Sequence, residues 1–373
     1  MATYNIEIWH KDGYPLADIR QFCSNLNWSK TLNGSETLTF TIDLNRYEEL
    51  LKSLGYSTAP FDLMEVGRND IRVKRNGVYL LGTNVYRFNY ITQDPGIEVN
   101  VQCVGYLNYY KTRYVTMDFD AETSQDEILF QVIEQCNSET GGDYGVRRGA
   151  VLGNMRTRTR HYKRKEVASL IQQMANCIGG PDFDFTPDKF FNIYETKGTY
   201  HPNIMLYYPE LHGKPGNIQS FNFTRSIDGV ANFVMGIGSG NGADAVQSTA
   251  EYALGEGDIY RREKVVLWNS VSRQDTLDEH TNAVLHQVQD IIEIPTVTLR
   301  DGVLNLNEVD VGDTVNLNLA SNLMLRHING AYRIQKIECS VDDSDAEMVT
   351  LSFDDLDIDT IIANQQLAEE EDE

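Results

Sequence analysis

Long hydrophobic runs are missing from this 373-residue sequence. No stretch approaches the ~18 uncharged apolar residues that a membrane helix needs, so we expect no membrane-spanning segment. The first residues lack a basic segment followed by an apolar run, which argues against a secretory signal. The five cysteines are scattered and form no CxxC pair. This spacing predicts buried thiols in a protein made in a reducing cytoplasm, rather than disulfides or a zinc site.

Positive charge is also scarce, since 32 Lys and Arg face 55 Asp and Glu and the formal net charge is −23. A protein that binds nucleic acid without regard to sequence gains affinity by neutralising phosphates, so this class is excluded. The acidity is concentrated toward the end of the chain, where residues 337–373 hold 14 acids and no Lys or Arg. We expect residues 356–373 to form an acidic tail.

The motifs of enzymes and cofactor sites are absent as well. The sequence contains no GxSxG elbow, no HExxH pair and no GxxxxGK[ST] loop, and the glycine run at 236–242 lacks the spacing of a dinucleotide fingerprint. Acid pairs such as Asp182 with Asp184 could act as glycosidase carboxylates, and Asp301 with residues 310–313 could hold calcium. Such groupings occur freely among 55 acids. We therefore predict no catalytic residue, no cofactor and no metal ligand.

Alternating apolar residues dominate the first and last thirds of the sequence. Period-2 patterns at 4–8, 38–44 and 97–103, with an Asn76-Gly77 turn between strand-like runs, predict a β region over residues 1–112. Residues 215–355 return to this pattern, interrupted by a Gly-rich insertion at 236–258 and a helix at 275–292.

The middle of the chain changes to helical spacing. Ser124 and Glu127 form a capping-box pattern before one amphipathic helix, and a second begins near Val167 and ends at Gly179. With a hairpin near residues 183–194, this predicts a small α+β domain over residues 113–214. The fold class is therefore mainly β with an α+β insertion.

Two stretches of the sequence read alike. Met64-Glu65-Val66-Gly67 and Val309-Asp310-Val311-Gly312 are each followed by an alternating strand, an Asn-Gly pair and further strands. Chance similarity and a true duplication are about equally compatible with these short matches. A duplication would give two similar barrels on either side of the middle domain.

One basic segment stands out, because residues 147–165 hold eight Lys or Arg and no acid. On a strand, Arg156, Arg158 and Arg160 would point one way, and Lys163 and Arg164 continue the basic run. The segment is interpreted either as a solvated face or as a surface that pairs with acidic groups of an adjacent subunit. Contact with nucleic acid is the least favoured interpretation, since interleaved aromatic residues are missing.

Short phrases that occur in a fixed order carry a family resemblance. They are Trp28-Ser29-Lys30, Leu38-Thr39-Phe40-Thr41-Ile42, Asn76-Gly77-Val78-Tyr79-Leu80-Leu81-Gly82, residues 97–106, Val167-Ala168-Ser169-Leu170-Ile171, Phe183-Asp184-Phe185 and Val309-Asp310-Val311-Gly312-Asp313-Thr314-Val315. With these phrases, residues 1–355 resemble the baseplate hub or tail-tip hub proteins of tailed bacteriophages, minor tail proteins that close the distal end of the tail tube.

The resemblance implies a non-enzymatic structural protein of the virion, located at the phage tail tip. It implies a homotrimer in which each chain supplies two tube-like β-barrels, so that three chains match a hexameric tube. The implied partners are the distal tail protein ring, the tail tube protein, the tape-measure protein and fibre or spike proteins, with DNA passing through the lumen. The alternatives are a tail-associated cell-wall hydrolase and a carbohydrate-binding adhesin.

Overall fold

The computed structural model describes residues 2–353, except 94, 95, 178, 209, 212, 213, 241, 253–258, 270, 290, 291 and 320–322. In this part the protein is mainly β, with its longer helices in the middle and last thirds, which confirms the predicted class. No helix among these residues is long and apolar enough to cross a membrane. The predicted acidic tail, residues 356–373, lies outside the described residues.

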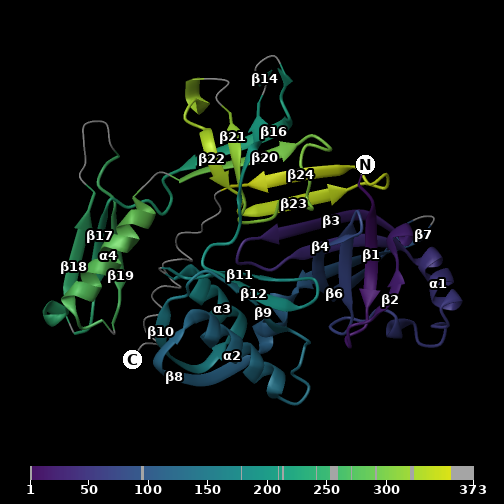
Figure 1. Ribbon diagram of the computed structural model, residues 1–373, viewed down its shortest axis with the longest axis horizontal. Coiled ribbons are helices and arrows are strands. Elements are labelled where there is room, and N and C mark those ends of the chain that lie inside the picture. The colour runs from purple at the N-terminus through teal and green to yellow at the C-terminus, as the bar shows by residue number, and fades with distance from the viewer. Residues whose placement is uncertain are drawn as a thin grey trace.

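The largest sheet, called the main sheet below, joins the first third of the chain to the last third (Figure 1). Its strands are β1 (Tyr4–Trp9), β2 (Pro15–Asp18), β3 (Cys23–Thr31), β4 (Thr37–Asp43), β5 (Asp70–Arg75), β6 (Val78–Gln93), β7 (Gly96–Gly105), β16 (Ile218–Ser226), β20 (Ile292–Leu299), β23 (Lys336–Val341) and β24 (Glu347–Ser352). The spatial order is β16-β20-β24-β23-β3-β4-β7-β6-β5-β1-β2. The two thirds meet where β3 pairs with β23, with Trp28 opposite Cys339.

One hydrophobic core holds both ends of the chain together. The alternation seen in the sequence places every second side chain of β1 in this core, as the period of a strand requires. The core runs from Tyr4 to Phe353 and includes Trp28, Phe40 and Leu351. The described strand order is open at β2 and β16, so no sheet in this part of the chain closes into a barrel.

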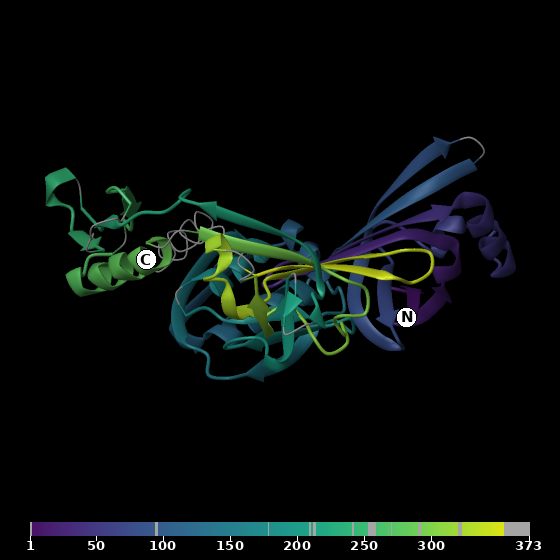
Figure 2. The same cartoon turned by 90° about the horizontal axis from the view of Figure 1, so that it is seen from above.

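Helix α1 (Leu44–Ser53) packs beside β4 and β7 at one end of the molecule (Figure 2). It begins at Leu44, because the Asp43 side chain accepts a hydrogen bond from the Arg46 backbone N–H and caps the helix. Its buried residues are Tyr47 and Leu51. The β6–β7 hairpin projects from the body next to this helix (Figure 2).

A second core defines the middle module, residues 106–194. Ser124 precedes α2 as predicted, but its side chain makes no capping hydrogen bond, and the Glu127 carboxylate instead binds Arg148. The capping-box prediction is therefore wrong. The elements are η3 (Tyr106–Thr112), β8 (Tyr114–Ser124), α2 (Gln125–Ser138), β9 (Arg147–Leu152), β10 (Thr157–Glu166), α3 (Val167–Asn176), β11 (Asp182–Phe185) and β12 (Phe190–Tyr194).

A third core lies in the β17–α4 module, residues 231–288, at the other end of the molecule from α1 (Figures 1 and 2). Its elements are β17 (Phe233–Ile237), η4 (Gly242–Asp244), β18 (Gln247–Glu251), β19 (Glu263–Leu267) and α4 (Gln274–Val288). Helix α4 covers one face of the sheet. Gly236 permits this packing, since a Cβ there would lie 2.2 Å from Thr281 Oγ1 and 2.8 Å from the Trp268 ring.

The Gly-rich insertion predicted at 236–258 is therefore wrong in part, because it contains the end of β17 and all of β18. Residues 241 and 253–258 of that insertion lie outside the described residues. The helix predicted at 275–292 ends at Val288, and Ile292 already belongs to β20. The remaining elements are η1 (Arg20–Phe22), η2 (Pro60–Asp62), β13 (Tyr200–Tyr207), β14 (Glu210–Leu211), β15 (Lys214–Pro215), β21 (Thr314–Asn318), η5 (Leu323–Leu325) and β22 (Asn329–Arg333).

The two similar stretches of sequence adopt the same turn. Gly67 and Gly312 both have positive φ, 72° and 92°, a conformation that favours glycine. The Gly67 N–H donates to the Val85 carbonyl, 2.7 Å away, and the Gly312 N–H donates to the Ile334 carbonyl at the same distance. The first turn is thus fixed to β6, and the second to the residue that directly follows β22.

The acidic residue of each turn also makes the same two hydrogen bonds. The backbone N–H of Glu65 donates to the Asn69 side chain, and that of Asp310 donates to the Asp313 side chain, both at 2.9 Å. The next backbone N–H donates to the Glu65 or Asp310 carboxylate itself. Three hydrogen bonds therefore match in the two copies, although the side-chain acceptor lies four residues after Glu65 and three residues after Asp310.

The Asn-Gly pairs are not equivalent in the two stretches. Asn76 and Gly77 have φ of 51° and 79° and form the tight turn between β5 and β6, as predicted. Asn329 and Gly330 instead lie inside β22, opposite Asn318 and Leu317 of β21. The predicted second Asn-Gly turn is wrong.

Candidate functional site

The basic segment begins on β9 with Arg147 and Arg148, and its remaining cations lie just before or on β10, which pairs antiparallel with β8 along one edge of the middle module. The pairing register shifts between Arg158 and Arg160, and again between Tyr162 and Lys165. Exposure falls along the first part of the strand: Arg156 is exposed, Arg158 is half-buried and Arg160 is only 4% exposed. The three arginines therefore do not form one open basic stripe.

The arginines gather at the C-terminal end of α3. Burial raises the pKa of the Cys177 thiol, which caps that helix, while the positive charges of Arg158, Arg160 and Arg156 act to lower it. A Cβ added to Gly179 would lie 2.2 Å from Arg156 Cζ, so this side chain packs against the turn that follows α3. Cations at a helix C-terminus are stabilised by the partial negative charge of its free carbonyls.

The two other predicted interaction residues, Lys163 and Arg164, lie in the second register shift and are exposed. Arg164 has a φ of 51°, which costs ~1 kcal/mol or more for a non-glycine residue, and its N–H donates to Thr116 Oγ1. This local geometry presents both cations outward from the edge of β10. With Arg156 they are the exposed members of the five predicted residues, and we call these three residues the exposed basic surface of β10.

Part of the basic sequence segment is paired within the module. Arg148 binds Glu127 and Glu134 of α2, and Arg147 binds Asp143. These pairs hold β9 against the helix and its following loop. The run of cations in the sequence therefore overstates the positive charge that the surface presents.

A cluster of charges between the middle module and the main sheet was not predicted. Lys197 Nζ lies 2.8 Å from Asp184 and 3.2 Å from Asp310, and Lys30 Nζ lies 3.1 Å from Asp310. These four side chains line a cavity, and Glu36 lines it as well. We call these five residues the junction cluster.

Further ion pairs hold the middle module to the two β regions. Lys189 Nζ lies 2.6 Å from Asp70 of β5, and these side chains are 8% and 2% exposed. Arg333 of β22 binds the Asp182 carboxylate, which also accepts a hydrogen bond from Asn33. Opposite charges thus connect elements from all three thirds of the chain.

The electrostatics of the junction cluster follow from burial and pairing. Burial raises the pKa of Glu36 to about 7. Burial also acts to raise the pKa of Asp310, but the positive charges of Lys30 and Lys197 hold the pKa of that carboxyl well below its usual range. Burial would lower the pKa of Lys197, yet Asp310 and Asp184 raise it above its usual value.

The acids that sequence reasoning considered for catalysis or calcium have structural partners. Asp182 and Asp184 belong to the pairs described above, and Asp313 accepts hydrogen bonds from Thr199 and pairs with His201. The Asp301 carboxylate accepts a hydrogen bond from the Glu347 N–H. Within the described residues, no group of three or more His, Cys, Asp or Glu side chains is arranged to hold a metal ion.

Comparisons of the sequence find no match, neither to a family profile nor to a curated protein. Comparison of the structure does find similar proteins. The tail protein of Neisseria meningitidis MC58 aligns with a TM-score of 0.67 and 11% identity, over 96% of this chain and 99% of that one. The 43 kDa tail protein of prophage MuSo2 from Shewanella oneidensis aligns with a TM-score of 0.62 and 9% identity, over 96% of this chain and 99% of that one.

Prophage tail protein gp18 from Listeria monocytogenes EGD-e aligns with a TM-score of 0.58 and 12% identity, over 98% of this chain and 99% of that one. These similarities span all three thirds of the chain, including the middle module. They agree with the resemblance to phage tail hub proteins found in the sequence. The structural neighbours are phage tail proteins, and this chain has their fold.

Proposed function

We propose that this protein is a structural component of a phage tail, a trimeric hub that closes the distal end of the tail tube and opens for the tape-measure protein and DNA. The observation that carries the proposal is the end-to-end likeness to a tail protein, with a TM-score of 0.67 over 96% of the chain. The partners are the distal tail protein ring, the tail tube protein and fibre or spike proteins.

The repeated turn supports a pseudo-sixfold arrangement. Two copies of one structural unit per chain, in three chains, supply six similar units to a hexameric tube. The units are the two β regions, residues 1–112 and 215–355, whose turns at Gly67 and Gly312 share their hydrogen bonds. In the trimer each unit forms one tube-like barrel, which neighbouring chains complete.

The net charge of −23 suits a conduit for DNA. Acidic walls repel phosphates, so a passing duplex does not adhere to them. This role needs no specific nucleic-acid binding, in agreement with the scarcity of Lys and Arg.

Light scattering of the purified protein tests the oligomeric state, and the expected mass is close to three times the 42.3 kDa of one chain. Electron microscopy of phage tails that carry a labelled copy tests the position, which we expect at the tip. A monomer that fails to enter tail particles would refute the hub.

The exposed basic surface of β10 is the proposed contact with an acidic neighbour. Replacing Arg156, Lys163 and Arg164 by Glu should reduce incorporation into particles at least tenfold, because each reversal turns an attractive pair into a repulsive one. Arg160 is left unchanged, since it is buried and its loss would disturb the fold. The control variant reverses three other exposed cations, Lys11, Lys111 and Arg300, and equal incorporation of both variants would contradict the contact.

A further inference from the structure

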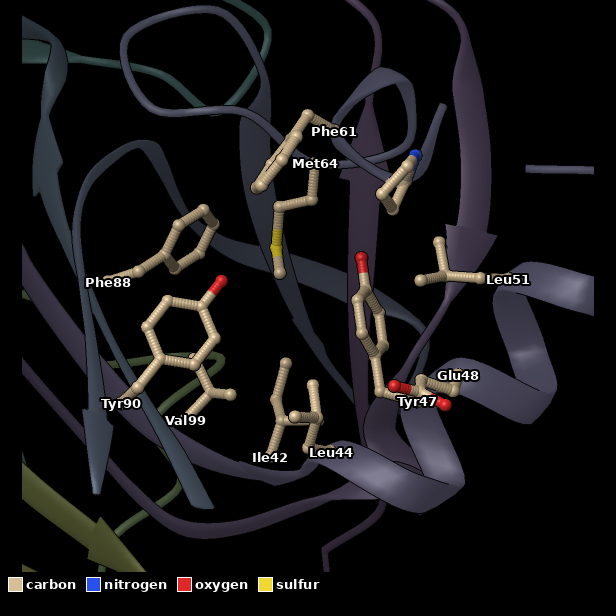
Figure 3. Close-up of a pocket in the computed structure, with 11 residues that line it drawn as sticks. Ile42, Leu44, Tyr47, Glu48, Leu51, Phe61, Met64, Phe88, Tyr90 and Val99 are labelled. Carbon is tan, nitrogen blue, oxygen red and sulfur yellow. The ribbon is translucent and has the colours of Figure 1, made fainter. Parts of the chain in front are cut away.

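A cavity of about 180 Å³ opens beside α1, at the end of the main sheet (Figure 3). Its walls are apolar side chains from α1, β4, β6, β7 and the segment around η2, among them Leu51, Met64, Phe88 and Val99. The rim is also apolar, because Phe61 and Tyr90 are 53% and 56% exposed. Such a cavity resembles the pocket of a binding hot spot more than a packing defect in a core.

Two polar groups of this pocket bear on its occupant: the Tyr47 hydroxyl, which is unpaired within the described part of the chain, and Glu48, whose carboxylate lies 3.9 Å from the exposed Lys52 Nζ. The Tyr47 side chain is 8% exposed, and its hydroxyl has no hydrogen-bond partner among the described residues. Figure 3 shows this hydroxyl between Met64 and Leu51. Leaving a buried hydroxyl unpaired is costly, and an occupant with a hydrogen-bonding atom would remove that cost. Glu48 supplies the one charge among the described residues that line the pocket.

Size and chemistry together define the occupant. An apolar cavity of ~150 Å³ accommodates a benzene ring, so this pocket fits one six-membered ring with a small substituent. The unpaired hydroxyl favours a substituent that accepts or donates a hydrogen bond. Glu48 favours a positive charge close to the ring. A tyrosine side chain next to an arginine satisfies all three conditions.

The chain itself presents this combination at Tyr260, the residue before Arg261 and Arg262. Tyr260 is 94% exposed, an unusual position for a large aromatic side chain. Its carbonyl accepts a hydrogen bond from the Asn232 side chain, and Asn232 also holds the Arg262 N–H, so the backbone is fixed while the ring extends into solvent. Arg261 lies 3.9 Å above the Phe233 ring.

We propose that the Tyr260 ring of one copy of this chain docks into the α1 pocket of the next copy. The ring fills the cavity, its hydroxyl hydrogen-bonds to Tyr47 Oη, and Arg261 faces Glu48. Tyr260 precedes β19, and the pocket lies beside α1, elements at opposite ends of the molecule (Figures 1 and 2). A contact between two different surfaces repeats from copy to copy, and it closes a ring when the rotation permits. This contact rests on the proposed trimer and names residues that join its subunits.

The first experiment measures association of the full-length protein by sedimentation over a dilution series. Tyr260→Ala should weaken association about 30-fold or more, as expected when a hot-spot anchor is removed. Tyr252→Ala is the matched control, because Tyr252 is 47% exposed in the same module and should change association less than threefold. Glu48→Arg should also weaken association, whereas Glu49→Arg, which alters the net charge equally, should not.

The second experiment tests the hydrogen bond. Tyr47→Phe and Tyr260→Phe should each weaken association about 2- to 12-fold, and the double variant should be no weaker than either single one. Tyr47→Phe should not lower the unfolding temperature of the monomer, because it removes an unpaired hydroxyl. Additive effects of the two substitutions would overturn the pairing of these two groups.

A photo-crosslink identifies the contact directly. Leu54 is 43% exposed at the end of α1, and it is replaced by the photo-crosslinker p-benzoylphenylalanine. Mass spectrometry of a mixture of isotope-labelled and unlabelled chains should detect a crosslink between position 54 of one copy and the peptide around Tyr260 of another copy. If the wild-type protein is a trimer but gives no such crosslink, and Tyr260→Ala associates as strongly as the wild type, the docking alone is overturned. A wild-type monomer that is absent from phage particles overturns the proposed function as well.

Discussion

The ion pair between Arg75 and Glu347 gives a sharp test of how the two ends of the chain are joined. Arg75 ends β5 and Glu347 begins β24, and the side chains are 7% and 4% exposed. Two parallel hydrogen bonds link them, Nε to Oε1 at 2.5 Å and Nη2 to Oε2 at 2.8 Å. The Tyr4 hydroxyl donates to the same carboxylate.

Arg75→Met should lower the free energy of unfolding by ~3–5 kcal/mol, because it leaves the Glu347 carboxylate buried without its counter-charge. For a 373-residue chain with an unfolding entropy of ~2.1 cal/mol/K per residue, a ~4 kcal/mol loss corresponds to a decrease in Tm of about 5 °C, measured by scanning calorimetry. The double variant Arg75→Met/Glu347→Leu should recover most of this loss, since no unpaired charge remains.

The control is Arg273→Met, which breaks the ion pair with Asp275. These two side chains are 75% and 66% exposed, so we expect no measurable change in Tm. The reasoning is refuted if Arg75→Met is as well tolerated as the control, or if the double variant is less stable than the single one.

Three further variants test other parts of the structure. Burial raises the pKa of Glu36 from 4.5 to about 7, so folding takes up a proton between these pH values. The free energy of unfolding should therefore fall as the pH rises from 4.5 to about 7. Glu36→Gln should flatten this pH dependence in a thermal-denaturation series at pH 4–8. Gly236→Ala should destabilise the β17–α4 module by ~1–3 kcal/mol in calorimetry, whereas Gly96→Ala, with open space around its Cβ, should not. Lys189→Met should loosen the middle module and speed its amide hydrogen exchange, because Asp70 stays buried without its counter-charge and keeps only the hydrogen bond from the Tyr109 hydroxyl.

Local sequence patterns predicted the individual elements well. The strands β1, β4 and β7 follow their period-2 runs, and α2 and α3 follow apolar residues at helical spacing. The errors occur where a distant contact decides the structure. Asn329-Gly330 has the composition of a turn, yet pairing with β21 makes it part of a strand.

For the basic segment too, the sequence identified the residues, and distant contacts decided which of them are buried. Sequence identified Arg156, Arg158, Arg160, Lys163 and Arg164 as unusual in an acidic chain. It gave no sign that Arg160 is buried, because the register shift in β10 and the end of α3 lie outside any local pattern. The junction cluster was likewise hidden, since Lys30, Lys197 and Asp310 are far apart in the chain.

By itself, then, the sequence determined the mainly β class, the helices of the middle module, the net charge and the resemblance to phage tail hub proteins. These depend on composition and on the period of neighbouring residues. Only the tertiary structure decided that β3 pairs with β23, that ion pairs connect the three thirds, and that a pocket with an unpaired hydroxyl opens beside α1. The physical reason is distance along the chain, because a contact such as Arg75 with Glu347 joins residues 272 positions apart.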